Sequence, residues 1–369
     1  MRRCLLSPWP LLFARSTLAA CECGYSVHTG TERTRYVFTD LFESDLVHVN
    51  VLGGEQGWAA QEDNRTAEAA RGPYGELFTV DDVFANTIAD RAVFDGDGVR
   101  GPGAGLQLMV KGNSEIAGGM VSNAEIATTG LDYFYGTYRA GIKVTDVEGT
   151  CSAFFWYQND TQEIDVEFLS AEFNRTNGTF PVNLVLQSAA SSAAGYDASG
   201  TPSFRRVNLP FDPTTAFHEY RFDFVRDRVV FYADGAVLAE MVGTGVPSSP
   251  GHLLLSHWSN GNPGWSRGPP KEDAVTTVSY VKAYYNSSLA SRMGDHARRC
   301  GNPAAEDAVC AVPENNATFF FTDGNNSNPN QTTDTDGGDK SGAGNLRVCL
   351  PFILTTVSAA GAWTCGSSS

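Results

Sequence analysis

The sequence has few basic residues and no long basic run. Lys and Arg together number 26 against 42 Asp and Glu, which gives a formal net charge of −16. An acidic chain without a basic patch does not attract a phosphate backbone or anionic lipid, so we expect no nucleic acid and no anionic membrane surface as partner. P-loop motifs and zinc-type spacings of Cys and His are also missing, so no nucleotide or metal site is predicted from motifs.

Long amphipathic helical patterns are absent as well, and short strand patterns take their place. Apolar and polar side chains alternate in residues 138–144, and residues 151–157 are almost wholly apolar, as in a strand covered on both faces. Asp234-Gly235 separates two further apolar runs and is a strong hairpin signal. These patterns predict an all-β fold, either an antiparallel sandwich or a barrel.

One stretch, residues 162–168 (QEIDVEF), differs from an ordinary half-buried strand. Glu163, Asp165 and Glu167 alternate with apolar residues at the positions between them. Successive side chains of a strand point to opposite faces, so the three acids share one face and the apolar residues share the other. A solvated strand has no need for three like charges on neighbouring positions of one face.

Carboxyl groups crowded in this way shift each other's pKa values apart, so one can stay protonated near neutral pH while another is ionised. Cleavage of a glycosidic bond needs such a pair, an acid for the leaving oxygen and a carboxylate for the sugar carbon. The stretch therefore favours a catalytic strand. An acidic edge strand is the alternative interpretation of the same residues.

Patterns typical of the secretory route occur at the start of the chain and along it. Arg2 and Arg3 precede an apolar stretch and small residues up to Ala20, which predicts a signal peptide over residues 1–20, with a buried first strand as the alternative. Eight N-x-Ser/Thr sites are expected to carry glycans, and they begin at Asn64, Asn159, Asn174, Asn177, Asn286, Asn316, Asn325 and Asn330. Among the eight cysteines, Cys300 and Cys310 are close enough to close a small loop, although sequence does not fix the connectivity.

The composition changes in the C-terminal part of the chain. Residues 291–347 are interpreted as a Cys-containing segment followed by a disordered, glycosylated spacer. Residues 348–369 form a tail with an apolar run that is short for a bilayer span. Small residues near Gly337, a polar spacer and this tail together resemble a GPI-attachment signal, and a C-terminal strand docked on the domain is the alternative.

Four motifs resemble those of glycoside hydrolase family 16, the β-jelly-roll enzymes that cut or transfer β-glucans. They are Glu163–Leu169, the lead-in Gly149–Phe155, the set Phe211–Thr214, Phe217–Tyr220 and Phe231–Gly235, and the tryptophan-bearing loop His257–Trp265. The regular E-x-D-x-E spacing is similar to the branch without a β-bulge, and Cys21–Tyr25 is similar to the mature start of secreted fungal members. The resemblance implies a concanavalin A-like β-jelly-roll sandwich of two antiparallel sheets, with a catalytic domain at residues 21–290.

The resemblance also implies roles for the acids. By motif position Glu163 would be the nucleophile and Glu167 the general acid/base of a retaining mechanism, with Asp165 holding or sharing a proton between them. No cofactor is implied. A structural calcium ion is common in the family, but no ligand set for it is readable in the sequence.

Side chains near the acids are candidates for substrate binding. Trp258 and Trp265 lie in a loop rich in Gly, Pro and Asn, which favours a surface for sugar rings over core packing. Tyr157 lies just before the acidic stretch, where either it or its neighbour Trp156 should face the core. Asn260 and Gln187 are candidates for contacts with sugar hydroxyls, with an ordinary polar turn as the alternative.

The sequence thus predicts a secreted, monomeric enzyme that hydrolyses or transfers β-glucan chains, with a GPI anchor as a membrane tether. A non-catalytic, lectin-like carbohydrate-binding protein on the same fold is the main alternative. A structural wall glycoprotein is a third interpretation.

Overall fold

The acidic stretch forms strand β12 (Gln162–Leu169) near the middle of a nine-stranded sheet in the computed structural model of the chain. The structure describes residues 21–112, 116, 118–243 and 245–323, all within one compact unit. The predicted signal peptide, the spacer beyond residue 323, the C-terminal tail and the glycosylation sites at Asn325 and Asn330 lie outside the described residues.

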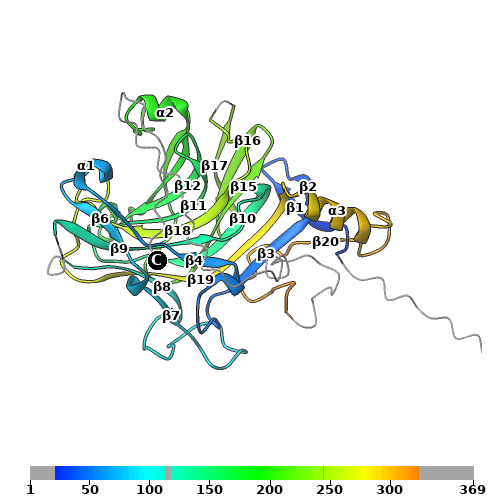
Figure 1. Ribbon diagram of the computed structural model, residues 1–369, viewed down its shortest axis with the longest axis horizontal. Coiled ribbons are helices and arrows are strands. Elements are labelled where there is room, and N and C mark those ends of the chain that lie inside the picture. Colours follow the sequence, from blue (N-terminus) through cyan, green and yellow to red (C-terminus); the bar gives the residue numbers. More distant parts are fainter. Residues whose placement is uncertain (1–20, 113–115, 117, 244, 324–369) are drawn as a thin grey trace, which may run out of the picture. The chain divides into compact units, whose positions relative to one another are not determined.

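Two large sheets make up the fold (Figure 1). The first has the order β17 (Ala236–Val242), β16 (Arg228–Ala233), β15 (His218–Val225), β10 (Tyr133–Lys143), β19 (Ala274–Ser287), β8 (Gly105–Val110) and β7 (Val83–Asn86), and β3 (Asp40–Asp45) also pairs with β19. The second has the order β14 (Phe204–Asn208), β13 (Pro181–Gln187), β12, β11 (Cys151–Asn159), β18 (His252–Trp258), β9 (Met120–Thr128), β6 (Gly75–Phe78) and β5 (Asp63–Arg65), and β4 (Trp58–Ala60) pairs with β9.

Helices are short and few among the described residues. They are α1 (Ala67–Ala70), α2 (Ala189–Ala193) and α3 (Ala290–Arg299), with single 3-10 turns at Gly54–Gln56, Val80–Asp82 and Ser170–Glu172. Every strand pair in the two large sheets is antiparallel except β6 with β9. The predicted all-β jelly-roll sandwich is confirmed. In the described part of the chain, no helix is long and apolar enough to cross a membrane.

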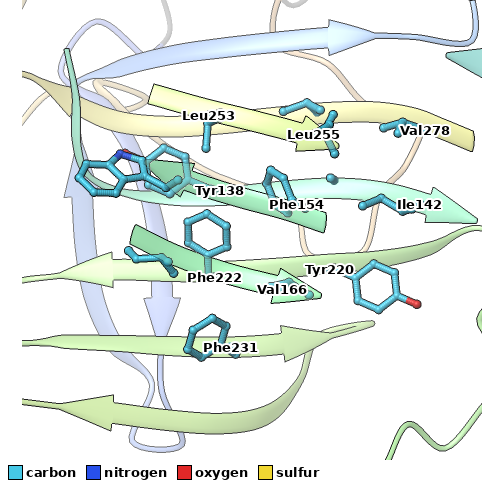
Figure 2. Packing of buried hydrophobic residues seen from close by; sticks show 14 of the residues in the cluster. Tyr138, Ile142, Phe154, Val166, Tyr220, Phe222, Phe231, Leu253, Leu255 and Val278 are labelled. Carbon is cyan, nitrogen blue, oxygen red and sulfur yellow. The ribbon is translucent and has the colours of Figure 1, made fainter. Parts of the chain in front are cut away.

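One hydrophobic core lies between the two large sheets. Phe154, Val166 and Leu255 of the nine-stranded sheet belong to the same buried cluster as Tyr138 and Phe222 of the other sheet, and Figure 2 shows their side chains between the two layers. Each large apolar side chain buried in this way contributes roughly 1.5–3 kcal/mol. The apolar half of the acidic stretch therefore anchors β12 in the core and directs its acids to the other face.

The predicted hairpin at Asp234-Gly235 joins β16 to β17. Both residues have positive φ, 45° and 75°, as a two-residue turn between antiparallel strands requires. Residues 138–144 and 151–157 fall in β10 and β11 with only Val144 beyond a strand end, so these strand predictions are confirmed.

The two ends of the described chain meet in a third, three-stranded sheet. Strand β1 (Gly24–Thr29) lies between β2 (Thr34–Phe38) and β20 (Val309–Ala311). Disulfides join Cys21 to Cys310 and Cys23 to Cys300, so a small loop closed by Cys300 and Cys310 is a wrong expectation. Parallel pairing of β1 with β20 brings the N-terminal cysteines to residues almost three hundred positions away, which spacing alone does not reveal. Residues 291–323 are thus part of the same unit as the sheets.

Candidate active site

The three acids of β12 lie on the face of the nine-stranded sheet that points away from the core. Ile164 and Val166 are buried between the sheets, whereas Glu163 and Glu167 are half-buried on the opposite face and Asp165 is 5% exposed. From Glu163 to Leu169, β12 pairs one to one with β11 and shows no bulge. The regular spacing of the acids in the sequence therefore corresponds to a regular strand in the structure. We call the outer face of the nine-stranded sheet, which carries Glu163, Asp165 and Glu167, the acid face.

Apolar side chains from neighbouring strands lie beside the acids on the same face of the sheet. Ala127, Ala153, Phe155 and Leu254 form a small buried cluster on this face, with Tyr157 packed against it. Phe155 lies opposite Asp165 on β11, and Ala153 lies opposite Glu167. Trp156 is fully buried in the core, so of the two aromatic residues before the acidic stretch it is Tyr157 that faces the acids.

Burial raises the pKa values of all three acids. Loss of hydration is the largest cause for Glu163, Asp165 and Glu167, and the negative charge of Glu167 raises the pKa of the other two further. The three groups therefore hold more protons at neutral pH than three solvated carboxyls would. A hydrogen bond between Asp165 and Glu163 raises the pKa of Asp165 and lowers that of Glu163, so Asp165 is the member that keeps its proton.

Two donors contact the same oxygen of Glu167. The indole Nε1 of Trp265 donates to Oε1 over 3.4 Å, and the thiol of Cys151 donates to Oε1 over 3.5 Å. Both bonds lower the pKa of Glu167 and oppose the effect of burial. Burial raises the pKa of the Cys151 thiol well above its usual range, which keeps the thiol protonated and able to donate.

The sequence pattern did not single out Cys151, because its proximity to Glu167 depends on the register of β11 against β12. A register in which Glu167 lies opposite Ala153 puts position 151 on the same face as the acids. Among the described cysteines Cys151 is the one without a disulfide, and a buried thiol in an otherwise bridged protein is the signal that could have marked it.

Tryptophan side chains border the acid face at its Glu167 end. Trp258 ends β18 opposite Cys151, and Trp265 follows in the adjoining loop; both are half-buried. Trp265 is hydrogen-bonded to an acid, so at least one edge of its indole is already committed.

Gln187 and Asn260 have different surroundings. Gln187 lies directly opposite Glu163 on β13, and among the described residues its buried Oε1 has no hydrogen-bond partner. Asn260 is only 3% exposed, and its Nδ2 donates to the carbonyl of Ala70 and to Glu76. Its Oδ1 accepts from Asn262 and Ser266. The structure therefore corrects the role expected for Asn260, which ties the tryptophan loop to α1, whereas Gln187 lies beside Glu163 with a buried oxygen that has no partner among the described residues.

Further acids lie on the β9–β6 side of the sheet. Burial raises the pKa values of Glu76 and Glu125 to about 7, and the charge of Arg65 opposes both shifts. These residues come from strands distant in sequence, so no local motif reveals them. In the part of the chain that the structure describes, no group of three His, Cys, Asp or Glu has the arrangement of a metal site.

Most of the predicted glycosylation sites within the described residues are accessible. The side chains of Asn64, Asn174, Asn177 and Asn316 are exposed. Asn159 and Asn286 are half-buried, and each accepts a hydrogen bond from a backbone amide, Asn159 from Thr161 and Asn286 from Thr39. Glycosylation stays a prediction at all of them.

The two packed antiparallel sheets form a β-jelly-roll sandwich, and one of them carries three acids on its outer face. The sequence model of the family "Glycosyl hydrolases family 16" matches residues 83–281, which is more than half of the chain and includes the whole acidic strand. The chain belongs to glycosyl hydrolase family 16.

Individual relatives match over shorter stretches. A beta-glucanase of Paenibacillus polymyxa is 32% identical over 133 residues, which cover 35% of this chain and 49% of that protein. Congo red hypersensitive protein 1 of Saccharomyces cerevisiae is 29% identical over 132 residues, covering 35% of this chain and 24% of that protein. The chain spans about half the length of the curated bacterial relatives it matches, such as this beta-glucanase.

Solved structures are similar at lower identity. The Bacillus licheniformis beta-glucanase superposes with a TM-score of 0.48 at 17% identity, over 66% of this chain and 97% of that one. The structure of apo Crh5 transglycosylase gives a TM-score of 0.45 at 17% identity, over 67% of this chain and 85% of that one.

Proposed function

We propose that this protein is an extracellular retaining glycosidase that hydrolyses or transfers β-glucan chains at the acid face. The observation that carries the proposal is the trio Glu163, Asp165 and Glu167, held on one sheet face with raised pKa values beside an apolar cluster. Membership of a family whose matched relatives include beta-glucanases supports β-glucan as the substrate class.

Glu163 and Glu167 divide the chemistry between them. Glu167, protonated, donates its proton to the glycosidic oxygen while the Glu163 carboxylate attacks the anomeric carbon, which forms a glycosyl ester and releases the leaving sugar. Glu167 then takes a proton from water or from a sugar hydroxyl, and that oxygen attacks the anomeric carbon and frees Glu163. Water gives hydrolysis and a sugar hydroxyl gives transfer.

The two roles rest on motif position, since burial raises the pKa of Glu163 to about 8 and that of Glu167 to about 7, and the contacts of each acid bear on how it would fill its role. The proton of Asp165, directed to Glu163, stabilises negative charge on the nucleophile. Trp265 and Cys151 both donate to Oε1 of Glu167, so the transferable proton belongs on Oε2. Gln187 and Tyr157 flank Glu163 on the neighbouring strands and are placed to contact sugar hydroxyls, and Trp258 offers a ring at the other end.

Two disulfides support an oxidising compartment, since such bonds persist in secreted proteins and are rare in the cytosol. A GPI anchor remains part of the proposal on the sequence pattern of residues 337–369 alone.

A panel of mixed-linkage β-glucan, β-1,3-glucan and chitin oligosaccharides tests the function. Wild-type protein should shorten or extend at least one glycan, and Glu163→Gln and Glu167→Gln should each lower the rate by at least about a hundredfold, because each removes a group that acts on the reacting atoms. Glu240→Gln is the matched control: it makes the same change on β17 of the other sheet, where Glu240 pairs with Arg228. Binding without turnover by the wild-type protein would favour the lectin-like alternative instead.

A further inference from the structure

Two loops that start near opposite edges of the nine-stranded sheet meet over its acid face. Arg71 follows α1 and Tyr196 follows α2, and the guanidinium carbon of Arg71 lies 4.4 Å from the centre of the Tyr196 ring. Helix α1 precedes β6, and α2 follows β13. In the sheet order β12, β11, β18 and β9 lie between those two strands, so the contact spans the strands that carry the acids. Figure 1 shows α1 and α2 on the same side of the curved sheet. We call this contact the Arg71–Tyr196 bridge.

Hydrogen bonds fix both ends of the bridge near the acids. At one end the backbone carbonyl of Arg71 accepts from the side chain of Asn262 in the tryptophan loop, and the charge of Arg71 lowers the pKa of Glu167. At the other end the Tyr196 hydroxyl donates to Asp160, which also accepts from Tyr157. Tyr157 lies opposite Glu163. The bridge therefore runs from the Glu167 end of the trio to the Glu163 end.

The backbone conformation at both partners is unusual for their residue types. Arg71 has φ of 59° and Tyr196 has φ of 68°, in the left-handed region that glycine adopts most easily. Gly72 follows Arg71 in the sequence, and Gly195 precedes Tyr196. Each turn therefore has a glycine directly beside the residue with positive φ. Arg71 is the left-handed C-cap of α1, where its backbone amide donates to the carbonyls of Ala67 and Glu68, so the end of the helix fixes where the Arg71 side chain begins.

We propose that Tyr196 is a sugar-binding platform that Arg71 covers in the free protein. A glycan that reaches Glu163 and Glu167 has to pass the bridge, and it does so by displacing the guanidinium from the ring. The face of a tyrosine ring that attracts a cation is also an apolar surface on which a pyranose can lie. The bridge then selects for glycans long enough to occupy both the acids and Tyr196. The proposal rests on the proposed function only for the location of the glycan.

The expected effect is modest and measurable. A cation–π contact with an exposed Arg contributes about 0.5–1 kcal/mol, and Arg71 is exposed. Removing Arg71 should therefore tighten glycan binding by about 2–5-fold, since 1.4 kcal/mol corresponds to tenfold. Removing the ring should weaken binding and abolish any gain from removal of Arg71.

A double-mutant cycle in the Glu163→Gln protein tests the platform by binding alone. The affinity for a long mixed-linkage β-glucan oligosaccharide is measured by calorimetry for the parent, Arg71→Gly, Tyr196→Ala and the double variant. Arg71→Asn is a second uncovering variant, since Asn tolerates the left-handed conformation and is too short to reach the ring. Tyr196→Phe is the matched control, because it keeps the ring and removes only the hydrogen bond to Asp160.

The proposal predicts a 2–5-fold gain for Arg71→Gly and Arg71→Asn, no gain when Tyr196 is Ala, and parent-like binding for Tyr196→Phe. An unchanged affinity in both Arg71 variants, or the same gain with and without the Tyr196 ring, overturns it. Absence of glycan binding by the parent also overturns it. Wild-type protein that binds glycan but never cleaves or transfers it would contradict the proposed function alone and would not contradict the platform.

Discussion

Replacing Cys151 by Ala should move the pH dependence of the enzyme without touching the substrate. The thiol donates to Oε1 of Glu167 and lowers the pKa of that acid. Its removal should therefore raise the pKa of Glu167. In the proposed mechanism Glu167 must be protonated to act as the acid, so the alkaline limb of the rate profile should shift to higher pH.

The size of the shift follows from the geometry of the contact. Hydrogen bonds to charged acceptors contribute about 1.5–3 kcal/mol, and a thiol is a weak donor, so about 0.5–1 kcal/mol is reasonable for the 3.5 Å contact. At 1.36 kcal/mol for each pKa unit, the alkaline limb should rise by about 0.4–0.7 units. Cys151→Ser is the matched variant: a hydroxyl is a stronger donor, so the limb should move down.

The assay is kcat/KM against pH for the three proteins on one β-glucan oligosaccharide, with thermal unfolding measured in parallel. A purely structural role for Cys151 would lower stability and activity evenly at every pH. An alkaline limb that stays in place in both variants, or that moves the same way in both, would refute the link between Cys151 and Glu167.

Three further predictions follow from other contacts. Trp265→Phe keeps a ring but loses the indole donor to Glu167, so it should shift the alkaline limb of the rate profile to higher pH with little change in KM. Trp258→Ala should instead raise KM with little change in the alkaline limb. Rate profiles against pH for both variants separate a donor to Glu167 from a ring that binds sugar. The raised pKa of Glu125, about 7 against an ordinary 4.5, means that the folded protein keeps a proton that the unfolded chain releases, so this residue lowers stability as pH rises from about 4.5 to 7. Glu125→Gln should therefore be more stable than wild type by about 1–3 kcal/mol at pH 8 and nearly equal to it at pH 4, by denaturant unfolding; the same difference at both pH values would contradict this. Removal of the Cys21–Cys310 disulfide, which spans 289 residues, should cost about 2–5 kcal/mol, seen as a lower unfolding midpoint in a Cys21→Ser, Cys310→Ser protein.

Local patterns in the sequence were sufficient to predict the strands at residues 138–144, 151–157 and 162–168 and the face of the sheet to which the acids point. Period-two alternation placed Ile164 and Val166 in the core and Glu163, Asp165 and Glu167 on the opposite face, because the geometry of a strand leaves no other arrangement. The turn at Asp234 was equally local, since its backbone conformation depends on two adjacent residues.

Contacts that depend on strand register or on the placement of loops could not be predicted from the sequence. The proximity of Cys151 to Glu167 requires the pairing of β11 with β12 to be known residue by residue. Asn260 looks like a polar loop residue and is instead buried against α1, which precedes it by about 190 positions. The Arg71–Tyr196 bridge joins opposite edges of one sheet, so it exists only after the sheet has curved and both loops are in place.

Mass spectrometry of products made in water enriched in heavy oxygen distinguishes glycosidic cleavage and transfer at Glu163 from glycan binding alone. Wild-type protein, Glu163→Gln and Glu240→Gln are incubated with the same β-glucan and chitin oligosaccharides. We expect shortened products that carry heavy oxygen, lengthened transfer products that do not, or both, from wild type and Glu240→Gln, and almost none from Glu163→Gln. A panel left unchanged by the wild-type protein, or identical products at an equal rate from Glu163→Gln, would contradict this expectation.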